Sequence, residues 1–156
     1  MFFNNTGYSS KNDTLAHKKN VSNKMKILID DMILRSVSHD DSKLCNPEKD
    51  IFDEYTPKLK DSTYMSDQYK EFLKEMQVAL DHHYEANRHH PEHFEHGIAD
   101  MTLVDLIEMI VDWKAASERH GDGDIIKSIE LNKDRFNYSD ELKQIFINTI
   151  KFYFDN

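Results

Sequence analysis

The stretch TLVDLIEMIVDWKAASER, residues 102–119, is the strongest structural signal in the chain. Thr102 precedes a run of apolar residues with helical spacing, and Asp105 stands where the acidic partner of a capping box belongs. We therefore predict a helix over Leu103–Arg119. Its length and its capping signal make it the reference from which the other elements are placed.

The rest of the chain has the same helical character. Four glycines and three prolines in 156 residues are too few for a many-stranded sheet, which needs turn residues about every eight to twelve positions. We predict an all-α fold: a single bundle of six or seven helices over residues 14–156, behind a loose arm at residues 1–13. The other expected helices begin after Thr14, cover Glu48–Tyr55 before Pro57, run from a Ser66 cap to about Arg88, cover Ile125–Leu131, and follow a Ser139 cap.

Composition excludes several classes of partner. The formal net charge is −9, from 20 basic and 29 acidic residues, so duplex nucleic acid and anionic membranes would be repelled. No apolar run approaches the roughly 18–20 residues that span a bilayer, and the first residues do not resemble a signal peptide. The single Cys45 rules out an internal disulfide and fits a reducing compartment. We expect a cytoplasmic protein with a small-molecule ligand; its oligomeric state, a homodimer included, is left open.

Histidines continue an apolar stripe on the helix that follows Ser66. Steps of three and four residues lead from Tyr69 through Leu80 and on to His83, Asn87 and His90. Either the helix leaves the core at Leu80, or its inner face enters a buried polar site. The histidines would then be metal or phosphate ligands, or members of a hydrogen-bonded network in the core.

The His39-Asp40 pair is a second candidate for chemistry. Adjacent residues cannot share one face of a regular helix, but both can reach one ion at a helix end, where the backbone changes direction. Asp112 lies among apolar residues on the predicted helix at 103–119, on the same face as Glu108. A buried carboxylate needs a cation or a histidine partner, and Glu108 could orient a ligand histidine.

These residues follow the order of a known family. His17, then His39-Asp40, then Asp112 resembles the H…HD…D signature of the HD superfamily of metal-dependent phosphohydrolases, and Lys43 matches its frequent His-Asp-x-x-Lys form. The segments HHPEH at 89–93 and 101–119 are most similar to an uncharacterised branch of that superfamily from phage and bacterial genomes. The resemblance spans residues 17–112.

The resemblance implies one divalent metal ion with four ligands: His17, His39, Asp40 and Asp112. Mn, Fe, Co, Ni, Zn and Mg all remain candidates for it. Some HD subfamilies add histidines that hold a second metal or grip phosphate, and here the candidates are His83, His89 and His90. The spacing of these three departs from those subfamilies, so a second ion is left open.

Helix geometry makes one demand on this ligand set. A helix running straight from Thr14 to His39 would separate His17 from His39 by about 33 Å, at 1.5 Å per residue. Two ligands of one ion cannot be so far apart. We therefore expect the chain to reverse near Asp30-Asp31 and to continue in a second helix over 31–38, although no glycine or proline marks a turn there.

The implied activity is hydrolysis of a small phosphorylated metabolite, a nucleotide by analogy with the family. Asp40 would take the proton of the attacking water, and Lys43 would bind the substrate phosphate. Arg88 and the histidines at 83, 89 and 90 are further candidates for substrate contacts. Two other classes remain open: a non-catalytic metal- or nucleotide-binding regulatory protein, including one encoded by a phage, and a di-iron oxygenase of the HD type.

Overall fold

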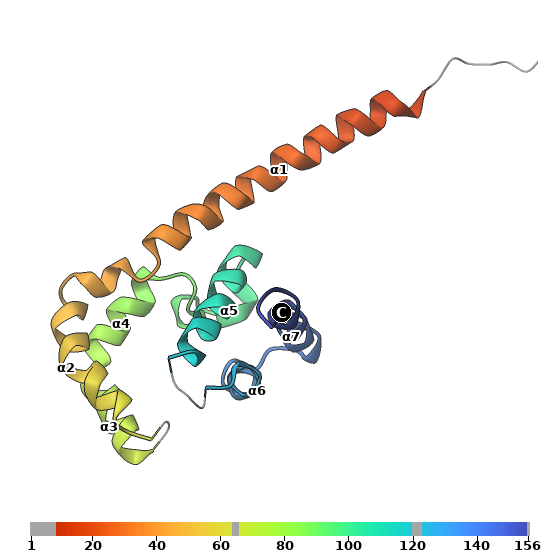
Figure 1. Cartoon of the computed structure of the whole chain (residues 1–156). Helices are drawn as coiled ribbons and strands as arrows, with labels where there is room; N and C mark the ends of the chain where they lie inside the picture. Colours follow the sequence, from red (N-terminus) through yellow and green to blue (C-terminus); the bar gives the residue numbers. More distant parts are fainter. Residues whose placement is uncertain (1–8, 64–65, 120–122, 156) are drawn as a thin grey trace, which may run out of the picture. The chain divides into compact units, whose positions relative to one another are not determined.

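The computed structural model describes residues 9–63, 66–119 and 123–155 (Figure 1), and within them the fold is all-α, without strands. This confirms the predicted fold class, and the described part contains seven α-helices, the upper end of the predicted range. They are α1 (Ser10–Ser38), α2 (Glu48–Lys60), α3 (Asp67–Glu75), α4 (Gln77–Ala86), α5 (Leu103–Ser117), α6 (Ile125–Phe136) and α7 (Asp140–Tyr153). Three short 3₁₀-helices join them: η1 (Asp41–Leu44), η2 (Pro91–His93) and η3 (Gly97–Asp100).

The chain divides into two compact units, Met1–Val37 and Ser38–Asn156. In the first unit, residues 1–8 of the predicted loose arm lie outside the described residues, and α1 already begins at Ser10. The helix is continuous, so the reversal predicted near Asp30-Asp31 is wrong. An ion pair between Arg35 and Asp31, 3.2 Å apart at i and i+4, supports the helix through this segment.

The core of the second unit lies where α5, α6 and α7 meet. Met109, Ile129 and Ile150 are fully buried there, one from each helix. Trp113 of α5 stacks on Phe136 of α6, with 6.2 Å between ring centroids. Because each helix has an apolar face but no core of its own, packing three such faces together supplies most of the stabilisation.

Side-chain caps fix where these three helices begin. Thr102 accepts a hydrogen bond from the Asp105 backbone N–H while the Asp105 carboxylate accepts one from the Thr102 N–H, which confirms the predicted capping box. Asp124 caps α6, and Ser139 caps α7 as predicted, accepting from the Leu142 N–H. Each cap satisfies backbone donors that the first turn of a helix leaves without intrahelical partners.

Helices α2, α3 and α4 form the other part of the second unit. Among them, α2 packs against both η1 and α4. The structure differs from the sequence prediction in two respects here. First, α2 continues through Pro57 to Lys60, because the backbone hydrogen bond that proline removes lies on an exposed face where water can replace it. Second, the single helix predicted from Ser66 to Arg88 is split at the buried Met76 into α3 and α4.

Among the described residues, no helix is both long enough and apolar enough to cross a lipid bilayer.

Candidate metal centre

Asp40 lies at the centre of the candidate site and belongs to two of its possible metal-binding groups. It follows α1 and precedes η1 with φ at 61°, a left-handed conformation that is uncommon for residues other than glycine but is tolerated by aspartate. The change of direction ends α1 and aims His39 and Asp40 toward the same region. The expectation that a helix end would let both residues of the His-Asp pair reach one site is therefore confirmed for their positions.

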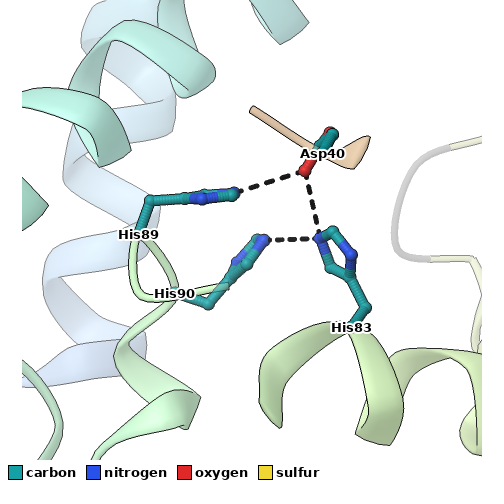
Figure 2. A group of neighbouring side chains, drawn as sticks. All are labelled: Asp40, His83, His89 and His90. Carbon is teal, nitrogen blue, oxygen red and sulfur yellow. Dashed lines mark hydrogen bonds and ion pairs between the residues drawn. The ribbon is translucent and has the colours of Figure 1, made fainter. Parts of the chain in front are cut away.

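Three histidines surround one oxygen of the Asp40 carboxylate (Figure 2). The Oδ1 atom lies 3.4 Å from His83 Nε2 and 3.5 Å from His89 Nε2, and His83 Nε2 lies 2.9 Å from His90 Nε2. His83 comes from α4, whereas His89 and His90 come from the loop that folds back after it. One ligand atom from each of the four residues lies within 4.8 Å of all the others.

The other oxygen of Asp40 faces a second group. His39 Nε2 lies 3.7 Å from Asp40 Oδ2 and 3.6 Å from Asp112 Oδ1. His39, Asp40 and Asp112 thus also meet the spacing for a metal site. Lys43 occupies the same side, with its Nζ 2.6 Å from Asp40 Oδ2. The Asp40 carboxylate therefore stands between two candidate ion positions, one for each oxygen.

Two carboxylates contact these histidines at the ring nitrogens that point away from Asp40. Oε1 of Glu108 accepts a hydrogen bond from Nδ1 of His39 at 2.9 Å and lies 3.2 Å from Nδ1 of His89, within ion-pair distance. Both Nε2 atoms are then left to face Asp40. Glu48, which is 0 % exposed, likewise accepts a hydrogen bond from His83 Nδ1 at 2.9 Å. A carboxylate bonded to the distal nitrogen is the usual support of a metal-binding histidine.

The histidines differ in charge. Burial, with the nearby charges of His89 and His83, lowers the pKa of His90 to about 3, and burial followed by the Lys43 charge lowers the pKa of His83. Both are neutral near pH 7, the form that binds metals. By contrast, the hydrogen bonds that His39 donates to Asp112, and then to Glu108, raise the pKa of His39 to about 10. When no metal is bound, the carboxylates around His39 therefore keep its imidazole protonated and positively charged.

This shift predicts a pH dependence of stability for protein stripped of metal. The folded-state pKa of His39 lies above the unfolded value of 6.5, so its contribution is complete below pH 6.5 and is lost as the pH rises toward 10. In urea unfolding with EDTA, the free energy of unfolding should fall over this range, and it should fall less steeply in His39→Gln. His96→Gln, at an exposed histidine paired with Asp100, is the matched control. Parallel pH curves for wild type and His39→Gln would contradict the assignment.

The structure brings together most of the predicted site residues. His39, Asp40, Asp112, Lys43 and the histidines at 83, 89 and 90 all lie in the cluster described above. His17 does not belong to any of the metal-binding groups found among the described residues. It is exposed on α1, about 31 Å along the helix axis from Ser38 at 1.5 Å per residue. The continuous helix removes the reversal on which its role as a ligand depended.

Arg88 has a structural partner. Its guanidinium makes a two-point contact with the fully buried Asp105, through Nε at 3.2 Å and Nη2 at 3.1 Å. This pair ties the histidine-bearing loop to the first turn of α5. A substrate contact by Arg88 stays a prediction.

Glu48 could not be identified from the sequence. Its hydrogen bonds with His82 and His83 join residues 34 and 35 positions apart, and no local pattern signals such a contact. The role suggested for Glu108, orienting a ligand histidine, agrees with the hydrogen bond that it accepts from His39 and with its ion-pair contact with His89.

Comparison with known proteins gives a family but no activity. No curated protein and no solved structure matches the chain. The profile of a family of unknown function, DUF5662, matches residues 6–152, a range that includes every residue of the cluster. Since this match covers nearly the whole of the 156 residues, the chain belongs to the family of unknown function DUF5662.

Proposed function

We propose that this protein is a metal-dependent phosphohydrolase that acts on a small phosphorylated metabolite. The observation that carries the proposal is a pair of buried polar atoms, Asp40 Oδ1 and His89 Nε2, which have no hydrogen-bond partner among the described residues. They lie 3.5 Å apart, and Asp40 Oδ1 also lies 3.4 Å from His83 Nε2. Leaving such groups unsatisfied is costly, and a shared cation would satisfy both at once.

The donor set fits a divalent transition metal. Ligands bound at about 2.0–2.1 Å in tetrahedral geometry lie about 3.3 Å from one another, close to the 3.4 and 3.5 Å from Asp40 Oδ1 to the two histidines. Three imidazoles and one carboxylate suit Zn, Mn, Fe, Co or Ni better than Mg, which prefers oxygen ligands. When bound, such an ion supplies a Lewis acid for a phosphoryl oxygen and acidifies a water molecule.

The chain's own residues would complete the reaction. In hydrolysis a water oxygen forms a bond to phosphorus, the phosphoester bond breaks, and the leaving oxygen takes up a proton. Asp40 or Asp112 would accept the proton of the attacking water. Both carboxylates are ionised at neutral pH: burial alone would raise the pKa, but Lys43 at Asp40 and His39 at Asp112 outweigh burial and hold it below the ordinary value.

Lys43 supplies positive charge for the substrate in an otherwise acidic chain. The Lys43 side chain is about one-third exposed, and its ammonium lies 5.3 Å from the centroid of the Phe52 ring and contacts Asp40. From there it can reach solvent and a phosphate placed beside the ion. The choice of a nucleotide as the substrate rests on the resemblance to the HD superfamily.

Metal content and turnover together test the proposal. Protein purified without chelator would be analysed for bound elements and then assayed with nucleoside mono-, di- and triphosphates and simple phosphoesters, with each of the candidate metals. We expect bound metal, hydrolysis that EDTA abolishes, and recovery on adding the metal back. A tightly held nucleotide without turnover would instead establish a binding protein, and two irons with oxygen consumption would establish an oxygenase; either result overturns hydrolysis.

Lys43→Ala is expected to lower kcat/KM for the best substrate while leaving the fold intact. A hydrogen bond to a charged group is worth about 1.5–3 kcal/mol, which corresponds to a loss of roughly 10- to 150-fold. Lys43→Arg should restore only part of the rate, because a planar guanidinium replaces a compact ammonium. Lys49→Ala, at an exposed lysine paired with Asp53, is the control and should match wild type. Equal rates for Lys43→Ala and wild type would remove Lys43 from the site.

A further inference from the structure

Lys43 and the histidines contact different oxygens of the same carboxylate. His83 and His89 approach Asp40 Oδ1, at 3.4 and 3.5 Å. Lys43 contacts Asp40 Oδ2 at 2.6 Å, on the side where His39 Nε2 lies 3.7 Å from the same oxygen. The two sides of Asp40 are therefore not equivalent: Oδ2 contacts a lysine ammonium, whereas Oδ1 faces imidazole nitrogens.

The Oδ1 side has the features of an ion position. The oxygen itself and His89 Nε2 are buried without hydrogen-bond partners in the part of the chain that the structure describes, and the His89 residue is only 2 % exposed. His83 and His90 turn their Nε2 atoms toward each other, 2.9 Å apart. Glu48 and Glu108 hold the far nitrogens of His83 and His89, so both rings are oriented before any ion arrives.

The Oδ2 side has the same carboxylate but a competing charge. An ion ligated by Oδ2 together with His39 and Asp112 would lie about 2 Å from the oxygen that Lys43 contacts. Two cations so close repel each other strongly in a partly buried site. Because η1 begins directly after Asp40 and the Lys43 backbone N–H donates to the Asp40 carbonyl oxygen at 2.9 Å, the lysine side chain starts beside the Asp40 carboxylate. Its Nζ also lies 5.3 Å from the centroid of the Phe52 ring.

We propose that Lys43 serves as the second cation of this centre: one divalent ion is held by Asp40 Oδ1, His83, His89 and His90, while the Lys43 ammonium takes the place at Asp40 Oδ2 that a second ion would need. The inference rests on the metal binding in the proposed function, and it adds the position and the number of the ions. Lys43 then sets the stoichiometry at one ion per chain. Its removal opens the position formed by His39, Asp40 and Asp112.

The test is a count of ions, without any assay of activity. Full-length protein stripped with EDTA would be titrated with Zn²⁺, and separately with Co²⁺, by calorimetry, followed by elemental analysis after gel filtration. We expect one ion per chain in wild type and two in Lys43→Met, which keeps an unbranched stem against Phe52 without the charge. Lys43→Arg, which keeps the charge, should bind one, and so should the double variant Lys43→Met/Asp112→Ala.

Lys49→Met controls for the loss of a lysine charge elsewhere on the chain and should bind one ion. Lys43→Gln provides a second neutral variant if Lys43→Met does not give the helical circular-dichroism spectrum of wild type. Two ions in wild type, or one ion in both neutral variants, would overturn the role of Lys43 and leave metal-dependent hydrolysis standing. No ion in wild type would overturn the metal centre itself, and the proposed function with it.

Discussion

Asp40→Ala is expected to abolish binding of divalent metal. Its two carboxylate oxygens face two of the candidate ion positions, Oδ1 toward His83 and His89 and Oδ2 toward His39, so that both of these positions lose a ligand. Stabilisation by the ion should vanish as well. An ion present at 100 times its Kd stabilises the folded state by about 2.7 kcal/mol, and the corresponding drop in Tm on adding EDTA should occur in wild type but not in the variant.

Two controls separate the carboxylate from the backbone. Alanine is strained where φ is 61°, whereas glycine adopts that conformation freely. Asp40→Gly should therefore lose metal as completely as Asp40→Ala while unfolding at a higher temperature. Asp41→Ala removes the adjacent, exposed carboxylate and should bind metal like wild type. Elemental analysis and Tm with and without EDTA are the readouts, and full metal occupancy in either Asp40 variant would show that the ligand assignment is wrong.

The second large effect is expected at Glu108. A single oxygen of this side chain accepts a hydrogen bond from His39 and lies 3.2 Å from Nδ1 of His89, so its loss frees both rings to rotate and to change tautomer. Glu108→Ala should weaken metal binding by about 10- to 100-fold, the usual range for residues that support a metal-binding histidine. Glu108→Gln should weaken binding less, because its amide oxygen can still accept the hydrogen bond from His39.

Competition with a chelating dye would measure the Kd, and circular dichroism would confirm that the helices are retained. Glu118→Ala is the matched control: Glu118 lies just past the end of α5, is well exposed and pairs with Lys114 at i and i−4. Its Kd should equal that of wild type. If Glu108→Ala binds metal within twofold of wild type, the carboxylate does not orient the histidines.

The features that could be predicted from the sequence are those that depend on local interactions. The caps at Thr102, Ser66 and Ser139 satisfy backbone donors within three residues, so each can be recognised from a short segment. The all-α class follows from the helical spacing of apolar residues and from the scarcity of glycine and proline. Asp112 could be inferred as a functional carboxylate because an acid amid apolar neighbours on a helix needs a partner.

The sequence by itself thus determined the helices, most of their starts and most of the residues of the cluster. Only the tertiary structure decided which of those residues meet. The split at Met76 and the passage of α2 through Pro57 depend on what each helix packs against, and the contacts of Glu48 join positions about 35 residues apart. His17 matched the family pattern in order along the chain, yet the unbroken α1 leaves it outside the metal-binding groups of the described residues. The physical reason is that capping and helical spacing act within one or two turns, whereas ligand convergence depends on how separate segments pack, which no short segment encodes.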